Sequence, residues 1–217
     1  GHISLRNIEF AVLDEADRML DMGFLPDVKR IVEKLPRHRQ TLMFSATLPR
    51  EITGLAQTML DNPVRVEITP PATVADNISQ KVMFVEQSDK RALLTDLLDD
   101  SDMRRALVFT RTKHRARTLA LELAKKSFRV AALQGNMSQN ARQQAMDGFR
   151  AGKFDIMVAT DIAAHGIDVP EVSHVINFDF PNTADTYLHR IGRTGRAEQT
   201  GEAFTFAGAD DADMVRE

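Results

Sequence analysis

Three carboxylates within four residues are the first feature of this 217-residue chain that could do chemistry. Asp14, Glu15 and Asp17 follow an apolar run at residues 8–13, in which Glu9 is the only charged residue. The length and β-branched content of this run favour a buried strand, whose carboxyl end is where open α/β folds bind ligands. Carboxylate oxygens there suit a hydrated Mg²⁺ ion and a water to be activated. Acidic residues also stabilise the first turn of a helix, so position alone leaves both interpretations open.

A second candidate site is the basic stretch HRIGRTGR at residues 189–196. Its three arginines, Arg190, Arg193 and Arg196, could present planar forks to phosphate oxygens and neutralise charge on a transferring phosphoryl group. The alternative is a helix end with basic residues favoured by the dipole. The two glycines between the arginines favour phosphate binding, because each costs about 1 kcal/mol inside a helix.

A third polar cluster, at residues 159–168, follows another apolar strand and ends in Asp168, which suits a hydroxyl ligand. His165, His174 and His189 share no metal-ligand spacing, so we expect hydrogen-bonding or surface histidines rather than zinc ligands. The phosphate-cradling pattern G-x-x-x-x-G-K-[ST] does not occur; the similar stretch at residues 148–154 has its glycines one residue too close and predicts a helix end.

Alternating strand and helix patterns must position these clusters, and they predict an α/β fold with parallel sheets flanked by helices. We expect a first domain at residues 1–68, a linker at 69–77 that contains tandem prolines, and a complete α/β domain at 78–217. The first domain should contain strands at 8–13, 41–44 and 64–68 and helices at 16–22, 26–35 and 49–59. The second should contain strands at 80–85, 106–110, 129–133, 155–160, 172–178 and 202–206, helices at 90–98, 113–126, 138–149 and 183–191, and the beginning of a helix at 210–217.

The composition excludes several classes of protein. A net charge of −3 argues against coating nucleic acid by bulk charge, although residues 104–129 carry nine Lys or Arg and one acidic residue. That basic stretch could face phosphates or could be a solvated helix face. Zero cysteines exclude disulfides and fit a reducing cytoplasm. No apolar run is long enough to span a membrane and no secretory signal is visible, so we expect a cytoplasmic protein without membrane contact.

Six motifs in one order give the chain a family resemblance that covers nearly its whole length. They are DEAD at residues 14–17, SAT at 45–47, VFTRT at 108–112, QGN at 134–136 with Gln139 and Arg142, ATDIAAHGID at 159–168, and HRIGRTGR at 189–196. In this order they resemble the motifs of the DEAD-box ATP-dependent RNA helicases. In its finer detail the sequence resembles the bacterial members of that family. The resemblance implies two RecA-like lobes: the end of the first at residues 1–68 and a complete second lobe at 78–217.

The family's activity is RNA duplex unwinding coupled to ATP binding and hydrolysis, and the resemblance assigns roles to residues. Asp14 would hold Mg²⁺ through water, and Glu15 would activate the attacking water. Arg193 and Arg196 would reach the γ-phosphate, and Asp168 would contact the ribose of ATP.

Two further groups are implied by the resemblance. Asp17, Ser45, Thr47 and His189 would link the state of ATP to the placement of the two lobes. RNA would be bound through phosphates and 2′-hydroxyls, without sequence preference, by the residues that match the family's RNA-lining positions: Thr110, Arg111, Gly135, Gln139, Arg142, Thr160 and Gly166.

The chain departs from the family in two ways. His165 replaces an arginine, so a permanent cation becomes a group that is mostly neutral near pH 7, and we expect a modest weakening of the network there. The adenine-reading segment, the phosphate-cradling loop and the first lobe's RNA motifs, which the family carries before Asp14, do not occur in these residues. We therefore expect the isolated chain to be inactive, and an alternative function is a non-catalytic RNA-binding or dimerising module. The remnant strands should expose apolar edges, so the first segment is expected to be partly disordered or to pair with another copy.

Overall fold

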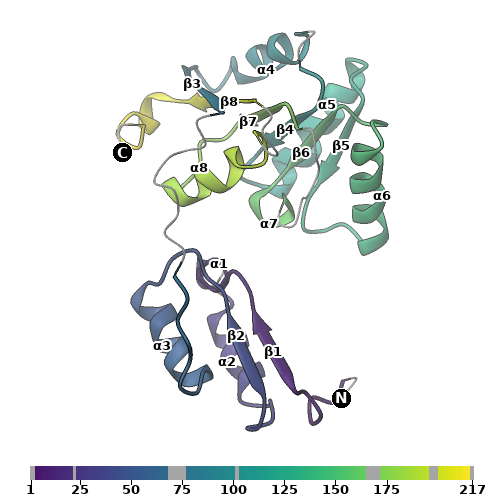
Figure 1. The fold of residues 1–217 in the computed structure, drawn as a ribbon. Coiled ribbons are helices and arrows are strands. Elements are labelled where there is room, and N and C mark those ends of the chain that lie inside the picture. The colour runs from purple at the N-terminus through teal and green to yellow at the C-terminus, as the bar shows by residue number, and fades with distance from the viewer. Residues whose placement is uncertain are drawn as a thin grey trace. The chain divides into compact units, whose positions relative to one another are not determined.

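The computed structural model describes residues 3–21, 23–67, 77–100, 103–164, 172–195 and 200–215. The chain divides into two compact units, residues 1–68 (unit 1) and residues 69–217 (unit 2). Both contain parallel strands flanked by helices, so the predicted fold class is confirmed (Figure 1). None of the helices in the described ranges has the length and apolar content needed to cross a membrane.

Unit 1 has a small sheet of two parallel strands. Residue Phe10 lies opposite Gln40 and Leu13 opposite Met43, so both strands end at the same edge. The elements are β1 (Phe10–Leu13), α1 (Ala16–Asp21), α2 (Leu25–Val32), β2 (Gln40–Met43) and α3 (Arg50–Met59). Their buried side chains form one small core of Leu13, Ala16, Val28, Ile52, Leu55 and Met59.

The turn from α1 to α2 shows why this segment folds locally. Gly23 has φ +75°, a left-handed conformation that glycine adopts without a Cβ clash. The N–H of Gly23 donates to Leu20 O (2.8 Å) and the N–H of Phe24 donates to Met19 O (2.9 Å). These bonds satisfy the carbonyls at the end of α1, as predicted from the glycine in the sequence.

Unit 1 also contains the clearest error of the sequence prediction. A third strand was expected at residues 64–68, but residues 64–67 form no strand, and residue 68 lies outside the described ranges. Val64 and Val66 are 91% and 81% exposed, because neither lies against a neighbouring strand or core in the described part of the unit. An alternating apolar pattern forms a strand only where a partner strand is available.

Unit 2 is built on a sheet of six parallel strands in the order β3-β8-β7-β4-β6-β5, which confirms the six predicted strands. The elements are β3 (Ile78–Phe84), α4 (Lys90–Leu98), β4 (Ala106–Phe109), α5 (Lys113–Lys125), β5 (Val130–Leu133), α6 (Gln139–Arg150), β6 (Ile156–Ala159), α7 (Asp161–Ala164), β7 (His174–Asn177), α8 (Ala184–Ile191), β8 (Gly201–Ala207) and the 3₁₀ turn η1 (Ala209–Asp211). Two of these differ from expectation: α7 was not predicted, and the expected C-terminal helix begins as the single turn η1.

Both faces of this sheet are buried. In β4, Ala106 and Val108 pack into one core with α4 and α5, whereas Leu107 and Phe109 pack into a second core with α6. Figure 1 shows these helices flanking the sheet. Burial on both faces explains why the strands of unit 2 read as continuous apolar runs in the sequence.

Three helices of unit 2 begin with a side-chain cap. Thr112, Ser138 and Thr183 each accept a hydrogen bond from the backbone N–H three residues later, at 3.2, 3.2 and 3.1 Å. Such caps satisfy one of the free N–H groups of the first turn. They define where α5, α6 and α8 leave the sheet edge.

Candidate functional site

In unit 1 the candidate carboxylates lie where β1 ends. Asp14 and Glu15 are both exposed, and the Glu15 N–H donates to Asp14 Oδ1 at 2.9 Å, which orients the Asp14 carboxylate. Glu15 has φ 51°, in the left-handed region that non-glycine residues rarely occupy. Such backbone strain is frequent at functional sites. The turn therefore holds two acidic side chains toward solvent at the carboxyl end of the strand.

The third carboxylate of the motif is held by the loop after β2. Asp17 Oδ2 accepts hydrogen bonds from the N–H (2.7 Å) and the hydroxyl (2.9 Å) of Thr47. The Ser45 hydroxyl accepts from the Asp17 N–H (3.1 Å) and donates to the Thr47 carbonyl (2.6 Å). Because β1 and β2 are parallel neighbours, residues that follow them meet at one edge. Asp17, Ser45 and Thr47 thus form one hydrogen-bonded cluster.

The pKa of the Asp17 carboxyl reflects this environment. Burial raises the pKa, but hydrogen bonds from Thr47, Arg18 and Ser45 favour the ionised form and together hold the pKa below its ordinary value. Asp17 is therefore an anion at neutral pH, locked to the loop after β2. Its contacts serve structure and orientation, whereas Asp14 and Glu15 remain exposed.

The geometry fits a magnesium ion held mainly by water. Among the residues that the structure describes, no three His, Asp or Glu side chains converge on a common point. Asp14 offers one exposed carboxylate, and Mg²⁺ is commonly held by one or two carboxylates together with waters and phosphate oxygens. Unit 1 can therefore supply one side of a Mg²⁺–nucleotide site, without the backbone cradle for phosphates.

In unit 2 the predicted RNA residues follow three adjacent strands. The N–H of Thr110 donates to Ala159 O (2.9 Å), and the N–H of Thr160 donates to Leu133 O (3.3 Å), so both extend the sheet by one residue. Both threonine side chains are buried, which gives them a role in holding the loops. Gly135 is exposed, and a Cβ there would meet nothing within 4 Å.

The exposed members of this group surround the same sheet edge. Gln139 is exposed at the first position of α6, where free backbone N–H groups favour anions. Arg111 is exposed after β4 and donates from Nη2 to Phe180 O at 3.3 Å. Arg142, on α6, donates from Nη2 to Ala163 O at 2.8 Å and so ties α6 to α7.

Arg190 and Arg193 of the basic motif are not equivalent. Arg190 is only 3% exposed, and its Nε and Nη2 form a two-pronged pair with the carboxylate of Asp161 at 2.6 and 2.8 Å. Its Nη1 donates to Asn177 Oδ1 (3.1 Å) and to Asp179 O (2.8 Å). The expectation that Arg190 presents its fork to phosphate is therefore wrong, because its donors are occupied inside the unit.

Arg193 is the arginine of this motif that the structure leaves partly accessible. It lies just beyond the end of α8, and its Nε donates to His189 O at 3.2 Å. His189 is exposed on α8. Arg196, together with Gly166, Asp168 and the replacement at His165, lies outside the described residues, so their predicted roles remain predictions.

The turn that follows Arg193 is packed tightly. The Thr194 hydroxyl donates to Val172 O (2.5 Å), and Asn77 Nδ2 donates to Gly195 O (2.5 Å). Gly195 has φ +65°, and a Cβ there would lie 2.6 Å from Ile78. A Cβ on Gly201 would lie 2.3 Å from Thr194 Oγ1. The glycines therefore allow the turn to lie against β3 and β8.

Sequence reasoning missed two buried charged residues, Lys90 and Asp179, and the partly exposed Asp161. Asp161 and Asp179 follow β6 and β7, and a carboxylate directly after an apolar strand is the signal that could have found them. Lys90 is 4% exposed and donates from Nζ to Phe178 O and Phe206 O, both at 3.3 Å. Burial lowers the pKa of Lys90, although Asp179 opposes this effect.

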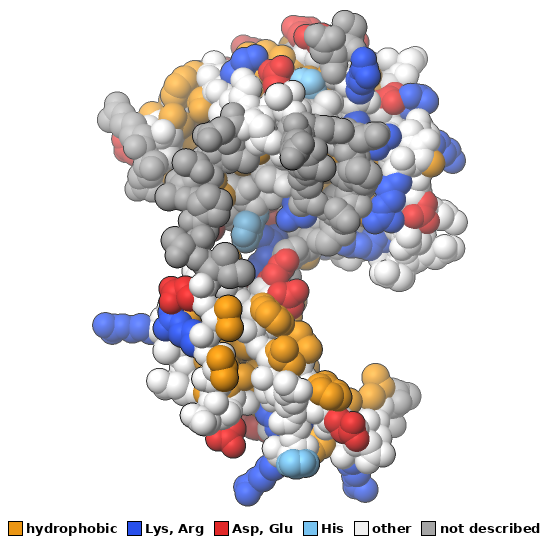
Figure 2. Space-filling model, in the orientation of Figure 1, with side chains coloured by type: hydrophobic (Ala, Val, Ile, Leu, Met, Phe, Trp, Pro, Cys, Tyr) orange, Lys and Arg blue, Asp and Glu red, His pale blue; other side chains and the backbone are white. Residues whose placement is uncertain are grey.

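Part of the basic stretch at residues 104–129 is structural. Arg129 and Arg115 form ion pairs with Asp155 and Asp179, and the Arg105 guanidinium lies over the Phe149 ring at 5.8 Å. Figure 2 shows other Lys and Arg side chains at the surface of unit 2. The sequence suggested two roles for this stretch, a phosphate-facing surface or a solvated helix face. The structure adds a third role, because some of these arginines form ion pairs within unit 2.

Two sequence families match the chain. Residues 89–198 match the helicase conserved C-terminal domain, and residues 1–55 match the DEAD/DEAH box helicase family. The match at residues 1–55 includes the carboxylates of unit 1, and the match at residues 89–198 includes Arg193 and the residues of unit 2 that are predicted to line RNA.

Several solved structures are similar. A DEAD box protein from the hyperthermophile Methanococcus jannaschii is 35% identical, with a TM-score of 0.62 over 99% of this chain and 58% of its own. S. cerevisiae Dbp5 bound to RNA and ADP BeF3 is 32% identical, with a TM-score of 0.85 over 99% of this chain and 57% of its own. E. coli DEAD-box protein SrmB bound to regulator of ribonuclease activity A is 40% identical, with a TM-score of 0.60 over 64% of this chain and 81% of its own. The chain thus spans 58% and 57% of the length of the first two structures.

Proposed function

The chain belongs to the DEAD-box helicase family, and we propose that it is part of an enzyme that couples ATP binding and hydrolysis to unwinding or remodelling of RNA duplexes. The observation that carries this proposal is the group of residues at the carboxyl ends of β4, β5 and β6. Arg111, Gly135 and Gln139 are exposed there, beside the buried Thr110 and Thr160 that hold the loops.

RNA is the ligand that this edge of unit 2 suits. An exposed arginine, an open backbone at Gly135 and the N-terminus of α6 offer donors to phosphate oxygens and 2′-hydroxyls. Such donors recognise the nucleic-acid backbone, so binding is proposed to depend on salt rather than on sequence. The structure of S. cerevisiae Dbp5 bound to RNA and ADP BeF3 supports this choice of ligand. Arg142 and, outside the described residues, Gly166 complete the proposed RNA surface.

Residues of each unit are proposed to act on the nucleotide. Asp14 would hold Mg²⁺ through water, and Glu15 would accept a proton from the attacking water. When bound, ATP supplies the phosphoryl group that is transferred, and Mg²⁺ supplies the cation that neutralises its charge. Arg193 and Arg196 would stabilise the same charge, and Asp168 would accept a hydrogen bond from the ribose.

Coupling between nucleotide and RNA is proposed to use the cluster around Asp17. Its hydrogen bonds to Ser45 and Thr47 fix the loop after β2 relative to the two catalytic carboxylates. His189 is proposed to take part in the same coupling. Residues 1–68, 69–77 and 78–217 are proposed to be the end of the first lobe, the linker and the second lobe. His165, in place of arginine, is proposed to weaken the network only modestly.

A second function, a non-catalytic RNA-binding or dimerising module, is favoured by one observation on this chain. The predicted exposure of apolar side chains is found in unit 1, where Phe10, Val12 and Phe44 are 64%, 61% and 52% exposed and Figure 2 shows hydrophobic side chains gathered over β1 and β2. A homodimer through this face is one way to cover it.

The proposed setting is bacterial and cytoplasmic, which identity to the E. coli protein and the absence of cysteine support.

The deciding experiment measures RNA binding and RNA-stimulated ATP hydrolysis by this chain and by its Glu15→Gln variant. We expect both proteins to bind single-stranded RNA, with affinity that falls as salt rises. Hydrolysis by the wild-type chain that Glu15→Gln abolishes would establish a complete ATPase centre. RNA binding without hydrolysis would support the module, and no RNA binding at all would contradict the proposed role of unit 2.

A further inference from the structure

The residue with the most demanding environment in unit 2 is Asp179, two residues after β7. It is 4% exposed, although it carries a carboxylate, and a buried carboxylate is costly unless its oxygens accept hydrogen bonds. Oδ2 accepts from the backbone N–H of Arg111 at 2.8 Å. Oδ1 accepts from Nη1 of Arg115 in a short ion pair. Both donors belong to the segment between β4 and the first turn of α5.

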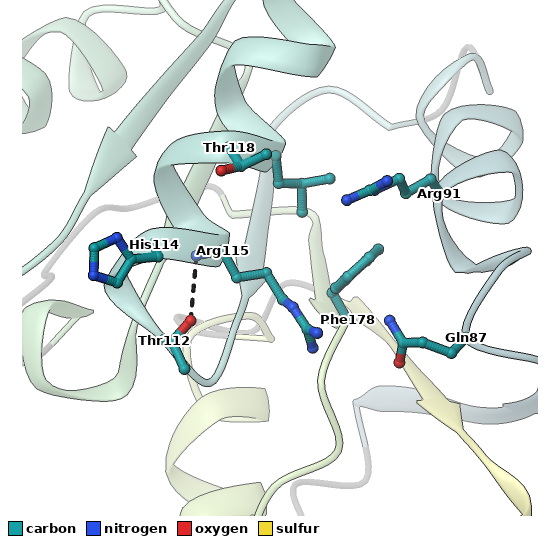
Figure 3. A pocket seen from close by; sticks show the side chains of 8 residues that line it. Gln87, Arg91, Thr112, His114, Arg115, Thr118 and Phe178 are labelled. Atoms are coloured by element: carbon teal, nitrogen blue, oxygen red, sulfur yellow. Dashed lines mark hydrogen bonds between the residues drawn. The ribbon is translucent and has the colours of Figure 1, made fainter.

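This segment is bonded to the sheet at its first residue, where the N–H of Thr110 donates to Ala159 O at 2.9 Å. The last bond of the ladder between β4 and the β7 segment runs from the Asp179 N–H to Phe109 O, at 3.2 Å. Beyond that point Arg111 is held by the Asp179 carboxylate and by its own bond to Phe180 O. Figure 3 shows Arg115 pointing toward Phe178 in a pocket of about 290 Å³ at the start of α5. Beyond Thr110, the loop is therefore held by the side chain of Asp179 rather than by hydrogen bonds of the sheet.

The carbonyl of the same residue is bound to the buried arginine of α8. Asp179 O accepts from Arg190 Nη1 at 2.8 Å, and the Arg190 guanidinium lies over the Phe109 ring at 5.1 Å. Arg190 also pairs with Asp161, the residue that follows Thr160. One chain of hydrogen bonds thus joins the loops after β4 and β6 to the helix that precedes Arg193.

We infer that Asp179 is a positioning residue, which holds the loop at residues 110–112 in the conformation that meets the RNA backbone and connects that loop to α8. This inference rests on the proposed RNA-binding function of unit 2. Aspartate is suited to the task because both of its oxygens are acceptors. Asparagine has one acceptor and one donor, so its amide N–H₂ would face either the Arg111 N–H or the Arg115 guanidinium.

The test compares the whole chain with two variants, Asp179→Asn and Asp185→Asn, which lose the same charge. Asp185 is exposed in the first turn of α8 and therefore reports the effect of net charge alone. We expect Asp179→Asn to weaken binding of a short fluorescent single-stranded RNA about tenfold at fixed salt, the effect of losing one charge-assisted hydrogen bond. Asp185→Asn should not weaken it. Equal affinities for Asp179→Asn and wild type would overturn the inference.

A double-mutant cycle separates positioning from a general loss of structure. If Asp179 acts through the loop, Arg111→Ala should weaken RNA binding in the wild-type background and add little in the Asp179→Asn background. Full additivity would mean that Asp179 does not act through Arg111. Hydrogen exchange at the Arg111 amide should also become faster in Asp179→Asn, because that N–H loses its acceptor.

A second variant keeps the inference testable if Asp179→Asn does not fold. Arg115→Gln removes one partner of Asp179 from a side chain that is 42% exposed, and it should show the same non-additivity with Arg111→Ala. A wild-type chain that does not bind RNA would contradict the proposed function and this role together. A wild-type chain that binds RNA, with Asp179 variants that bind equally well, would contradict this role alone.

Discussion

Unit 1 and unit 2 place their polar residues at the same point of the fold, the carboxyl end of parallel strands, but they hold these residues differently. In unit 1, two strands and a core of six buried side chains carry Asp14 and Glu15 on an exposed turn. In unit 2, six strands with both faces covered carry a network of charges that includes the buried Asp179 and Arg190 and the partly exposed Asp161.

The difference shows that a similar location does not imply a similar function. Exposed carboxylates on a small sheet are accessible to a cation or a water, as the proposed chemistry of Asp14 and Glu15 requires. Buried ion pairs are costly unless every donor and acceptor is matched, so the network in unit 2 fixes a geometry rather than performing chemistry. Groups at its rim, such as the exposed side chain of Arg111, are accessible to ligands.

The largest effect is expected from a substitution that breaks the network in unit 2. Arg190→Ala would leave the carboxylate of Asp161 and the carbonyl of Asp179 without this donor, which should lower the free energy of unfolding of unit 2 by about 3–5 kcal/mol. Arg193→Ala is the matched control in the same motif and should change it by about 0.5 kcal/mol or less. Urea unfolding measures both variants, and equal effects would show that the two arginines do not differ as their burial indicates.

A core substitution in unit 1 tests whether the two units are stabilised independently. Ile52 is fully buried in the core of unit 1, and Ile52→Ala should cost about 2–5 kcal/mol. Because the described core clusters of unit 2 contain no residue of unit 1, amide hydrogen exchange should become faster in residues 10–59 and stay unchanged in β4, β6 and β7. Ile31→Ala, at a half-exposed position of α2, is the control. Faster exchange in both units would show that they unfold together.

A smaller effect is expected from the hydrogen-bonded cluster around Asp17, and it depends on pH. Asp17→Asn should lower the free energy of unfolding of unit 1 by about 1–3 kcal/mol at neutral pH, because hydrogen bonds to a charged group are lost. The pKa of Asp17 is lower in the folded than in the unfolded chain, so its stabilisation is complete above the ordinary value of 3.8 and is lost as pH falls through the lowered pKa. Denaturation of both proteins over this pH range measures the change. A difference that stays constant to the lowest pH would contradict the assignment.

Most of the architecture could be predicted because it depends on local pattern. The strands of unit 2 are continuous apolar runs, and Ser138 and Gly23 mark helix ends through their own conformations and side-chain bonds. The strand expected at residues 64–68 failed because pairing depends on a neighbour, which the pattern Val64-Arg65-Val66 does not specify. The helix α7 was missed because four residues are too few for a periodic pattern.

The candidate site divides in the same way. The sequence by itself determined the order of the motifs and the acidic turn after β1. The family resemblance implied that Asp17 pairs with Ser45 and Thr47, and the hydrogen bonds between them confirm these two partners. Only the tertiary structure decided that Arg190 points inward while Arg193 stays accessible. Three arginines spaced three apart look alike in the sequence, and the order of strands, which places Asp161 and Asn177 around one of them, is set by packing between segments far apart in the chain.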